Sequence, residues 1–303
     1  MYVIVGATGR VGSRVADRLL TAGKRVRVIS RSFDRLKNFM SRGAEPFAGD
    51  AADTEFLTRA FSGATAVFSM IPPNLGAAKL RAYQNEISGS ISEALVETGV
   101  KHVVNLSSIG AQFAAKTGPI LGLHDHEKRL DRIRALNVVH LRAAYFMENL
   151  LTNIDLIRSR GILGSALDGG VSLHMIAVDD VAEAAARLLI DLDFTGKSVR
   201  LLLGERDLTM KEAADIIGRA IGRPALTYAQ FSYEDSRKAM VGMGISPDVA
   251  RAFVEMSRGL NTGYINRGTR RTPERTTRTS FEDFAKEFAR AYCADSPECA
   301  AAV

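Results

Sequence analysis

Three glycines near the start of the chain have the spacing of a phosphate-binding turn. Gly6, Gly9 and Gly12 follow the apolar residues 3–5 and precede an amphipathic segment over 11–20. Glycine permits a tight turn, lets the backbone approach a pyrophosphate and lets helix pack closely on strand, while unpaired N–H groups attract negative charge. An ordinary strand-to-helix turn is the alternative, but the flanking strand and helix favour a nucleotide site. Its predicted residues are Gly6, Thr8, Gly9, Arg10, Val11 and Gly12.

The end of the next expected strand, residues 25–29, indicates which dinucleotide binds. An acidic side chain there would hold a ribose 2′-hydroxyl, whereas a cation would accept a 2′-phosphate. Arg31 and Ser32 follow this strand, with no Asp or Glu between residues 30 and 32. We therefore expect NADP(H), with Arg10 as a second cation at the 2′-phosphate. Solvated loop arginines are the alternative, above all for Arg10.

The loops after the third and fourth expected strands complete this site. The first suits the adenine edge and the second suits the nicotinamide-ribose side. Asp53, in the first loop, has the position of an N-cap for a helix over 54–61. The residues predicted to contact the cofactor from these two loops are Asp50, Ala51, Met70, Ile71 and Pro72.

Alternating strand and helix patterns position these loops. Strands are expected at 2–5, 25–29, 45–48, 64–69, 102–106 and 138–141, and helices from near Val11, Asp34, Asp53, Ala77 and Ile120. Such repeated βαβ units predict an α/β fold class, a Rossmann-type doubly wound parallel sheet with a smaller C-terminal α/β lobe.

The pattern loosens after residue 150, which predicts a dinucleotide-binding domain over 1–150 and a substrate lobe over 151–303. Segments near 174–203 are expected to rejoin the sheet. The lobe's expected elements are a strand at 174–178, a helix over 181–190 capped by Asp179 and Asp180, a strand at 198–203, a helix opened by the Thr209 and Glu212 capping box, two helices within 231–260 and a last helix over 281–292. Aromatic and methionine residues within 231–260 favour lobe core over substrate wall.

Composition excludes several classes of protein. The 303 residues, 46% hydrophobic and 24% charged, suffice for one α/β core plus a lobe. No apolar run approaches the roughly 18 residues that cross a membrane, so a cytoplasmic protein is expected. Cys293 and Cys299 lack nearby histidines, which argues against a metal site or a disulfide framework.

The net charge of +6 does not by itself indicate nucleic acid. The densest basic cluster, the Arg/Thr-rich residues 267–278, has no interleaved aromatic residues and no reading helix. We expect it to meet a phosphate, a neighbouring subunit or solvent.

In this order, the motifs resemble the NmrA-like branch of the atypical short-chain dehydrogenase/reductase superfamily over nearly the full chain. The resemblance rests on residues 6–12, 49–53, 99–108, 141–149, 176–182 and 279–284. It implies a Rossmann domain that binds NADP(H) and a small lobe above the nicotinamide. It also implies either a reductase of quinones or azo compounds or a redox sensor that regulates a protein partner.

The catalytic positions depart from ordinary short-chain dehydrogenases, which combine a Ser with a Tyr-x-x-x-Lys motif. Ser107 follows the fifth strand, but the next helix has no tyrosine. His124 and Lys128 share a helical face there, and a histidine can act as a general acid near neutral pH. We predict His124, Lys128 and Ser107 as catalytic, with Ser107 and Lys128 also binding the cofactor. The alternative is that His124 and His126 are ordinary surface or supporting residues and that the neighbouring charges are solvated.

An aromatic acceptor would need a flat wall and a hydrogen-bond donor near its developing oxyanion, but no strong base. His124, Lys128 or backbone N–H groups near Ile109 and Gly110 fit the donor role. The predicted substrate wall is Tyr145, Phe146 and Asn149, although Glu148 and Asn149 also suit the cap of a helix over 150–158.

The leading hypothesis is an NADPH-dependent oxidoreductase that reduces a small aromatic or quinone-like acceptor by hydride transfer. We expect a monomer or homodimer that binds neither nucleic acid nor membrane. The missing tyrosine supports the alternative, a non-catalytic NADP(H) sensor acting through a protein partner. An isomerase that retains its nicotinamide would need an acid–base pair that the sequence does not reveal.

Overall fold

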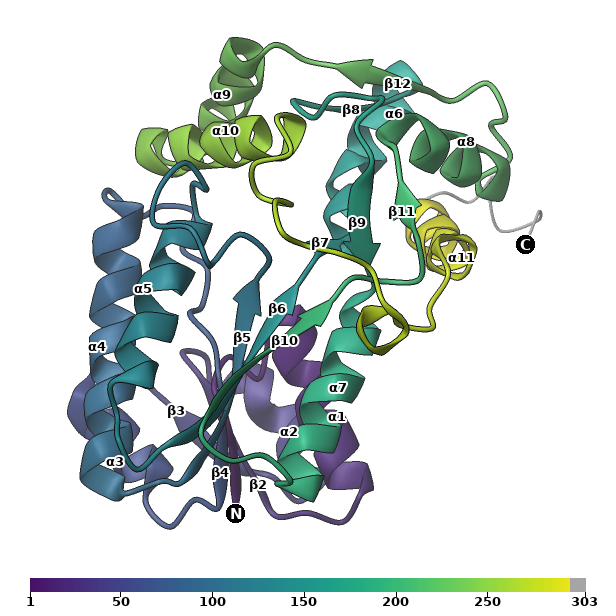
Figure 1. Ribbon diagram of the computed structural model, residues 1–303. Helices are drawn as coiled ribbons and strands as arrows, with labels where there is room; N and C mark the ends of the chain where they lie inside the picture. The colour runs from purple at the N-terminus through teal and green to yellow at the C-terminus, as the bar shows by residue number, and fades with distance from the viewer. Residues whose placement is uncertain (295–303) are drawn as a thin grey trace.

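Seven parallel strands form the main sheet of the computed structural model, which describes residues 1–294 (Figure 1). Their order is β10-β6-β5-β4-β1-β2-β3. The strands are β1 (Tyr2–Ile4), β2 (Val26–Ser30), β3 (Glu45–Ala48), β4 (Ala66–Ser69), β5 (His102–Ser108), β6 (Asn137–Ala143) and β10 (Lys197–Leu202). The order reverses direction between β1 and β4, where open α/β sheets bind ligands. The predicted Rossmann-type sheet is confirmed.

Helices cover both faces of this sheet (Figure 1). One face carries α1 (Arg10–Thr21), α2 (Lys37–Met40) and α7 (Val178–Asp191), and the other carries α3 (Thr54–Phe61), α4 (Leu80–Thr98) and α5 (Ile120–Asp131). Successive strand residues alternate between the two cores: Ile4 packs with the α1 and α7 side, whereas Val3 packs with the α3 and α4 side. Such burial on both faces explains the apolar runs of the central strands.

A smaller lobe lies beyond the carboxyl ends of the main strands (Figure 1). It contains two short sheets, one ordered β11-β9-β7 and one pairing β12 with β8. The strands are β7 (Tyr145–Phe146), β8 (Ile162–Ser165), β9 (Leu173–Ile176), β11 (Asp207–Leu208) and β12 (Thr227–Gln230); the helices are α6 (Ile154–Arg160), α8 (Met210–Ala220), α9 (Tyr233–Gly242), α10 (Pro247–Asn261) and α11 (Phe281–Cys293). Three 3-10 helices, η1 (Asp34–Leu36), η2 (Met147–Asn153) and η3 (Pro273–Arg275), join the longer elements.

The expectation that the strand near residue 174 rejoins the main sheet is wrong. This strand, β9, pairs with β7 and β11 in the smaller lobe, and β10 alone of the segments near 174–203 adds to the main sheet beside β6. All four residues of β9 are buried. A fully buried strand fits the middle of either sheet, so its pattern does not specify its neighbours.

Two helix starts in the second half differ from expectation. Ala177, not Asp179 or Asp180, is the N-cap of α7, and both aspartates lie within its first turn. Asp179 pairs there with Arg18 of α1 at 2.7 Å. The helix expected over 150–158 begins instead as η2 and becomes α-helical only at Ile154.

Two predicted helix caps are confirmed, but the lobe core expected within 231–260 is not, because α9 has no buried residue and Met243 is 72% exposed. Asp53 caps α3 by accepting from the Phe56 N–H, and Thr209 and Glu212 form a capping box at α8. No helix within residues 1–294 is both long and apolar enough to span a membrane. Cys293 is the half-buried last residue of α11, while Cys299 lies outside the described residues.

Candidate functional site

The glycine turn joins β1 to α1 with free hydrogen-bonding capacity. Gly6 has φ +70°, a conformation that favours glycine, and its carbonyl accepts from the Gly9 N–H at 2.9 Å. Gly9 is the N-cap of α1, provides no side-chain cap, and no acidic residue lies in the first turn. The first N–H groups and the positive end of the helix dipole are therefore available to an anion.

Two contacts explain why this turn needs glycine. A Cβ on Gly12 would lie 2.3 Å from the Gly6 carbonyl oxygen, so a side chain there would separate α1 from β1. A Cβ on Gly6 would lie 2.7 Å from Sδ of Met70, at the end of β4. The turn is thus packed against the neighbouring loop as the motif predicts.

A cavity of about 540 Å³ opens at this point of the sheet. It is lined by Val5, Gly6, Thr8, Gly9, Ile29, Ser30, Arg31, Ser32, Arg35, Gly49, Asp50, Ala51, Met70, Pro72, Pro73 and Tyr83. We call it the dinucleotide pocket. It brings together residues from the ends of β1, β2, β3 and β4, as predicted for a nucleotide site.

Six predicted cofactor residues do not line this pocket. They are Arg10, Val11, Gly12, Ile71, Ser107 and Lys128. Val11 and Ile71 are buried among core side chains. The Arg10 guanidinium donates to the Glu148 carbonyl oxygen at 2.9 Å, so it is turned toward η2.

The cations at the pocket are Arg31 and Arg35. Arg31 is exposed and forms no hydrogen bond or ion pair with any residue in 1–294. Arg35, which the sequence analysis missed, donates to the Thr8 carbonyl oxygen at 3.1 Å. No local pattern signalled it, because Arg31 and Arg35 do not share a helix: Arg31 precedes η1 and only Arg35 lies within it. Ser32 lies between β2 and these side chains, with its N–H donating to Ser30 Oγ.

Asp50 and Tyr83 also line the pocket. Asp50 accepts from the Ala52 N–H at 3.0 Å through Oδ1. Tyr83 of α4, also missed from sequence, donates to the Pro72 carbonyl oxygen at 3.0 Å. Burial raises the pKa of the Tyr83 hydroxyl, so it remains a neutral donor near pH 7. A flat ring and a carboxylate suit one edge of a purine.

The end of β5 is organised differently. Ser107 is 3% exposed, and its hydroxyl donates to Glu127 Oε1 at 2.5 Å. Arg142 of β6 donates to both oxygens of the same carboxylate, at 3.0 Å and 2.6 Å. The residue of α5 that reaches Ser107 is therefore Glu127, which the alternative interpretation of this helix placed on a solvated face.

The predicted partners His124 and Lys128 are not brought to Ser107. His124 is half-buried, and its Nδ1 donates to the Ala111 carbonyl oxygen at 2.7 Å. Lys128 is exposed and contacts no charged or polar partner among the described residues. The backbone donors near the β5 tip are also occupied, because Ile109 N–H donates to Ala143 and Gly110 N–H to Gln112.

His126, expected at the surface or in a supporting role, is fully buried. It bonds Ser69 of β4 at 3.0 Å and Ser88 of α4 at 2.8 Å. Burial is the main reason that its pKa falls to about 3, with smaller contributions from His140 and Arg129. His126 is thus a neutral hydrogen-bonding residue of the interior.

These groups belong to three hydrogen-bonded clusters of side chains between the sheet and helices α4 and α5, which together we call the polar layer. Its members are Ser69, Ser88, Asn105, Ser107, Glu127, His126, Asp131, His140 and Arg142. Hydrogen bonding within these clusters offsets the cost of burying most of their polar atoms; Asn105 Oδ1 is buried with no partner among the described residues.

The predicted substrate wall lies at the lobe boundary. Tyr145 and Phe146 form β7, are half-buried and pack against the larger core. Burial raises the pKa of Tyr145, and a hydrogen bond from Asn149 opposes that shift. Glu148 accepts from the Val178 N–H, so its carboxylate satisfies a donor at the start of α7 and not at its own helix.

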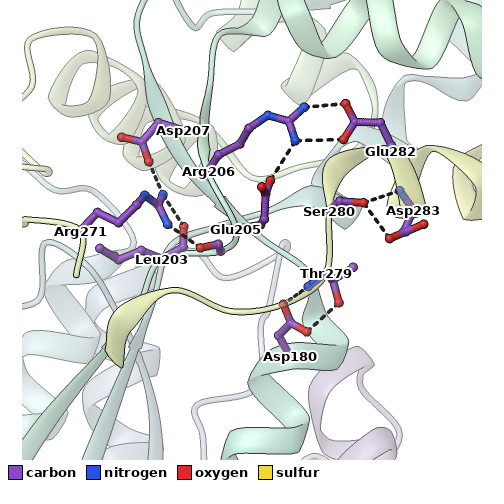
Figure 2. A network of polar contacts seen from close by, with 11 residues as sticks. Asp180, Leu203, Glu205, Arg206, Asp207, Arg271, Thr279, Ser280, Glu282 and Asp283 are labelled. Carbon is purple, nitrogen blue, oxygen red and sulfur yellow. Dashed lines mark hydrogen bonds and ion pairs between the residues drawn. The ribbon is translucent and has the colours of Figure 1, made fainter. Parts of the chain in front are cut away.

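The Arg/Thr-rich loop belongs to a crossing segment, residues 262–280, which we call the strap. Arg271 of the strap binds Asp207 and donates to the Leu203 and Gly204 carbonyl oxygens, and Thr279 donates to Asp180 at 2.6 Å (Figure 2). Arg206 pairs with Glu282 just beyond the strap at 2.6 Å. Several of its arginines and threonines therefore tie the two lobes together.

Fold and site define a dinucleotide-binding protein of the Rossmann type. The NmrA-like family model matches residues 2–284, and the chain belongs to that family. The resemblance deduced from the motifs is confirmed.

Related proteins agree with this assignment over nearly their full lengths. The chain is 27% identical to an NAD(P)H azoreductase of Xenophilus azovorans, covering 96% of this chain and 99% of that one. It is 28% identical to a (4-alkanoyl-5-oxo-2,5-dihydrofuran-3-yl)methyl phosphate reductase of Streptomyces griseus, at the same coverage. The solved NADPH complex of an Escherichia coli NADPH-dependent quinone oxidoreductase has the same fold, with a TM-score of 0.79, 22% identity and coverage of 95% and 99%.

Proposed function

We propose that this protein is an NADPH-dependent oxidoreductase that reduces a small aromatic or quinone-like acceptor by hydride transfer. An NAD(P)H-dependent oxidoreductase is supported by the full-length relatives named as reductases. The observation that carries the cofactor choice is the dinucleotide pocket, where Arg31 is exposed and unpaired within residues 1–294.

Each part of NADPH has residues of suitable chemistry. Backbone N–H groups of the glycine turn, with Thr8, suit the pyrophosphate, while Arg31, Arg35 and Ser32 suit the 2′-phosphate. Asp50, Ala51 and Tyr83 suit the adenosine, and Met70 and Pro72 lead toward the nicotinamide. When bound, the reduced nicotinamide supplies the hydride.

His124 is the proposed proton donor. A carbonyl oxygen only accepts, so the bond to Ala111 fixes the proton of the neutral imidazole on Nδ1. Nε2 then takes up and delivers a proton, and it forms no hydrogen bond with residues 1–294. Lys128 is exposed on the same helix, so its role in this proposal is limited to a positive charge near the acceptor, without direct contact.

The test is NADPH oxidation by the purified protein with a panel of quinones and azo dyes, with NADH in parallel. Arg31→Ala is expected to weaken NADPH binding at least tenfold, the value of one hydrogen bond to a charged group, with little effect on NADH. Arg278→Ala, an exposed arginine outside the pocket lining, is the matched control. Equal use of both cofactors, or unchanged NADPH affinity in Arg31→Ala, would contradict the assignment.

Catalysis is tested separately at α5. His124→Gln is expected to lower turnover with NADPH affinity retained, whereas Lys128→Ala is expected to have the smaller effect because its side chain lies in solvent. Equal turnover in wild type and His124→Gln would remove His124 from the mechanism.

The alternative is a redox sensor that binds NADP(H) and acts through a protein partner. It is favoured by the absence of tyrosine on α5 and by the engagement of Ser107 with Glu127. Clearly different affinities for NADP⁺ and NADPH, with no acceptor reduced, would support the sensor over the enzyme.

A further inference from the structure

The proton of the Ser107 hydroxyl has a fixed destination. A serine has one O–H donor, and in this structure it is directed at Glu127 Oε1, 2.5 Å away. The bond is short, buried and made to a carboxylate, which places it among the stronger hydrogen bonds in proteins. No donor within residues 1–294 fills the lone pairs of Ser107 Oγ.

Glu127 is itself prevented from turning away. Arg142 holds both of its oxygens, and the two side chains are only 6% and 16% exposed. Gln112 approaches Arg142 at 3.5 Å and also accepts from the Gly110 N–H. The carboxylate therefore has a single orientation, with Oε1 toward Ser107.

Ser107 lies at the edge of the sheet where the nicotinamide half of the cofactor is expected. Within the parallel pair of β4 and β5, Ser69 lies opposite Asn105, so Ser107 is level with the residues that follow β4. Met70, the first of those residues, lines the dinucleotide pocket. Ser107 does not itself line the pocket, but it lies at the same carboxyl edge of the sheet as Met70, which does.

We infer that Glu127 is a positioning residue that makes Ser107 a hydrogen-bond acceptor for an N–H or O–H group of the nicotinamide riboside. This inference rests on the proposed NADPH-dependent function. It reverses the expected role of Ser107 as a donor to the substrate, because donation would require breaking the bond to Glu127. That bond is short, buried and made to a carboxylate, so breaking it carries a cost that accepting a hydrogen bond from the cofactor avoids.

Binding of two ligands separates this role from a merely structural one. Adenosine 2′,5′-bisphosphate occupies only the adenosine end of the pocket, whereas NADPH also reaches Ser107. Ser107→Ala and Glu127→Gln are each expected to raise the dissociation constant of NADPH about fivefold, the value of one neutral hydrogen bond, and to leave that of the bisphosphate unchanged. The double variant should be no weaker than the single variants, because both act on one contact.

Ser108→Ala is the matched control, since the Ser108 hydroxyl donates to the Ile109 carbonyl oxygen. Unchanged NADPH affinity in Ser107→Ala, additive effects in the double variant, or equal weakening of both ligands would overturn the inference. If Glu127→Gln does not fold, Ser107→Ala against Ser108→Ala decides alone. Failure of the wild type to bind either ligand would instead contradict the proposed function.

Discussion

The dinucleotide pocket and the polar layer lie side by side along the same sheet, yet they use their polar groups in opposite ways. In the pocket, Arg31 and the first N–H groups of α1 have no partner among the described residues. In the polar layer, Glu127 accepts three hydrogen bonds and His126 forms two. The first region retains its capacity for a ligand, whereas the second uses its capacity internally.

This difference distinguishes groups that are available to bind a ligand from groups that stabilise the fold. Groups exposed at strand ends are solvated until a ligand replaces water, so they contribute little to folding stability. Buried polar groups must be satisfied within the protein, because an unpaired one carries its full desolvation penalty. Substitutions in the pocket should therefore change affinity. Substitutions in the polar layer should change the free energy of unfolding, and only those at Ser107 and its positioning residue Glu127 should also change NADPH affinity.

The largest expected effect is on Arg142→Met. Methionine fills most of the volume but leaves the buried Glu127 carboxylate without its charged partner. Removing one member of a buried pair costs about 3–5 kcal/mol, which urea unfolding would measure. Arg237→Ala, which breaks the exposed pair with Glu234 on α9, should leave the free energy of unfolding nearly unchanged, because solvent screens that pair. Similar losses in the two variants would remove the distinction between the polar layer and the surface.

Gly12→Ala tests a residue of the phosphate motif whose role is packing. The added Cβ would meet the Gly6 carbonyl oxygen at 2.3 Å, so backbone must move. We expect a loss of about 3 kcal/mol in unfolding free energy and loss of NADPH binding, measured by denaturation and by titration. Gly89→Ala in α4 has no atom within 4 Å of its Cβ and should gain up to about 1 kcal/mol. Full NADPH binding by Gly12→Ala would mean that the turn tolerates a shifted helix.

The same contrast explains what the sequence could predict. The glycine turn, Arg31 and Asp50 act at strand ends through local backbone geometry, which a βαβ pattern locates. The pairing of Ser107 with Glu127 joins residues 20 positions apart on different elements, so no local pattern contains it. His126 lies on a helix whose polar and apolar residues do not separate into clear faces, so its burial is evident only from its contacts with β4 and α4. His124 and Lys128 lie on the same helix at the expected spacing. His124, however, bonds the Ala111 carbonyl oxygen of a loop, and Lys128 is exposed to solvent.

Acid should destabilise the polar layer through His126. Its pKa of about 3 in the folded protein lies below the value of about 6.5 in an unfolded chain. Between these values the unfolded state binds one more proton than the folded state. The contribution of neutral His126 to the free energy of unfolding is therefore complete above pH 6.5 and falls as the pH is lowered toward 3. The limiting slope is about 1.4 kcal/mol per pH unit, or about 2 kcal/mol at pH 5. Unfolding curves of His126→Asn should show a correspondingly shallower slope, and an unchanged slope would exclude His126 as the titrating group.

The smallest effects are expected at two aspartates of one loop, Asp50 and Asp53. Although they are only three positions apart, Asp50 lines the dinucleotide pocket and Asp53 supports the fold. Asp53 caps α3 at 3.0 Å from the Phe56 N–H, so Asp53→Ala should cost about 1 kcal/mol of stability and leave NADPH affinity unchanged. Asp50 is exposed at the pocket, so Asp50→Ala should weaken NADPH about fivefold while changing stability by about 0.5 kcal/mol or less. Thermal unfolding and NADPH titration of both variants measure the four quantities. The opposite result, in which Asp53→Ala weakens NADPH binding and Asp50→Ala lowers stability, would mean that Asp53 at the start of α3 binds the adenosine. Asp53 would then be a ligand-binding residue and Asp50 a supporting one.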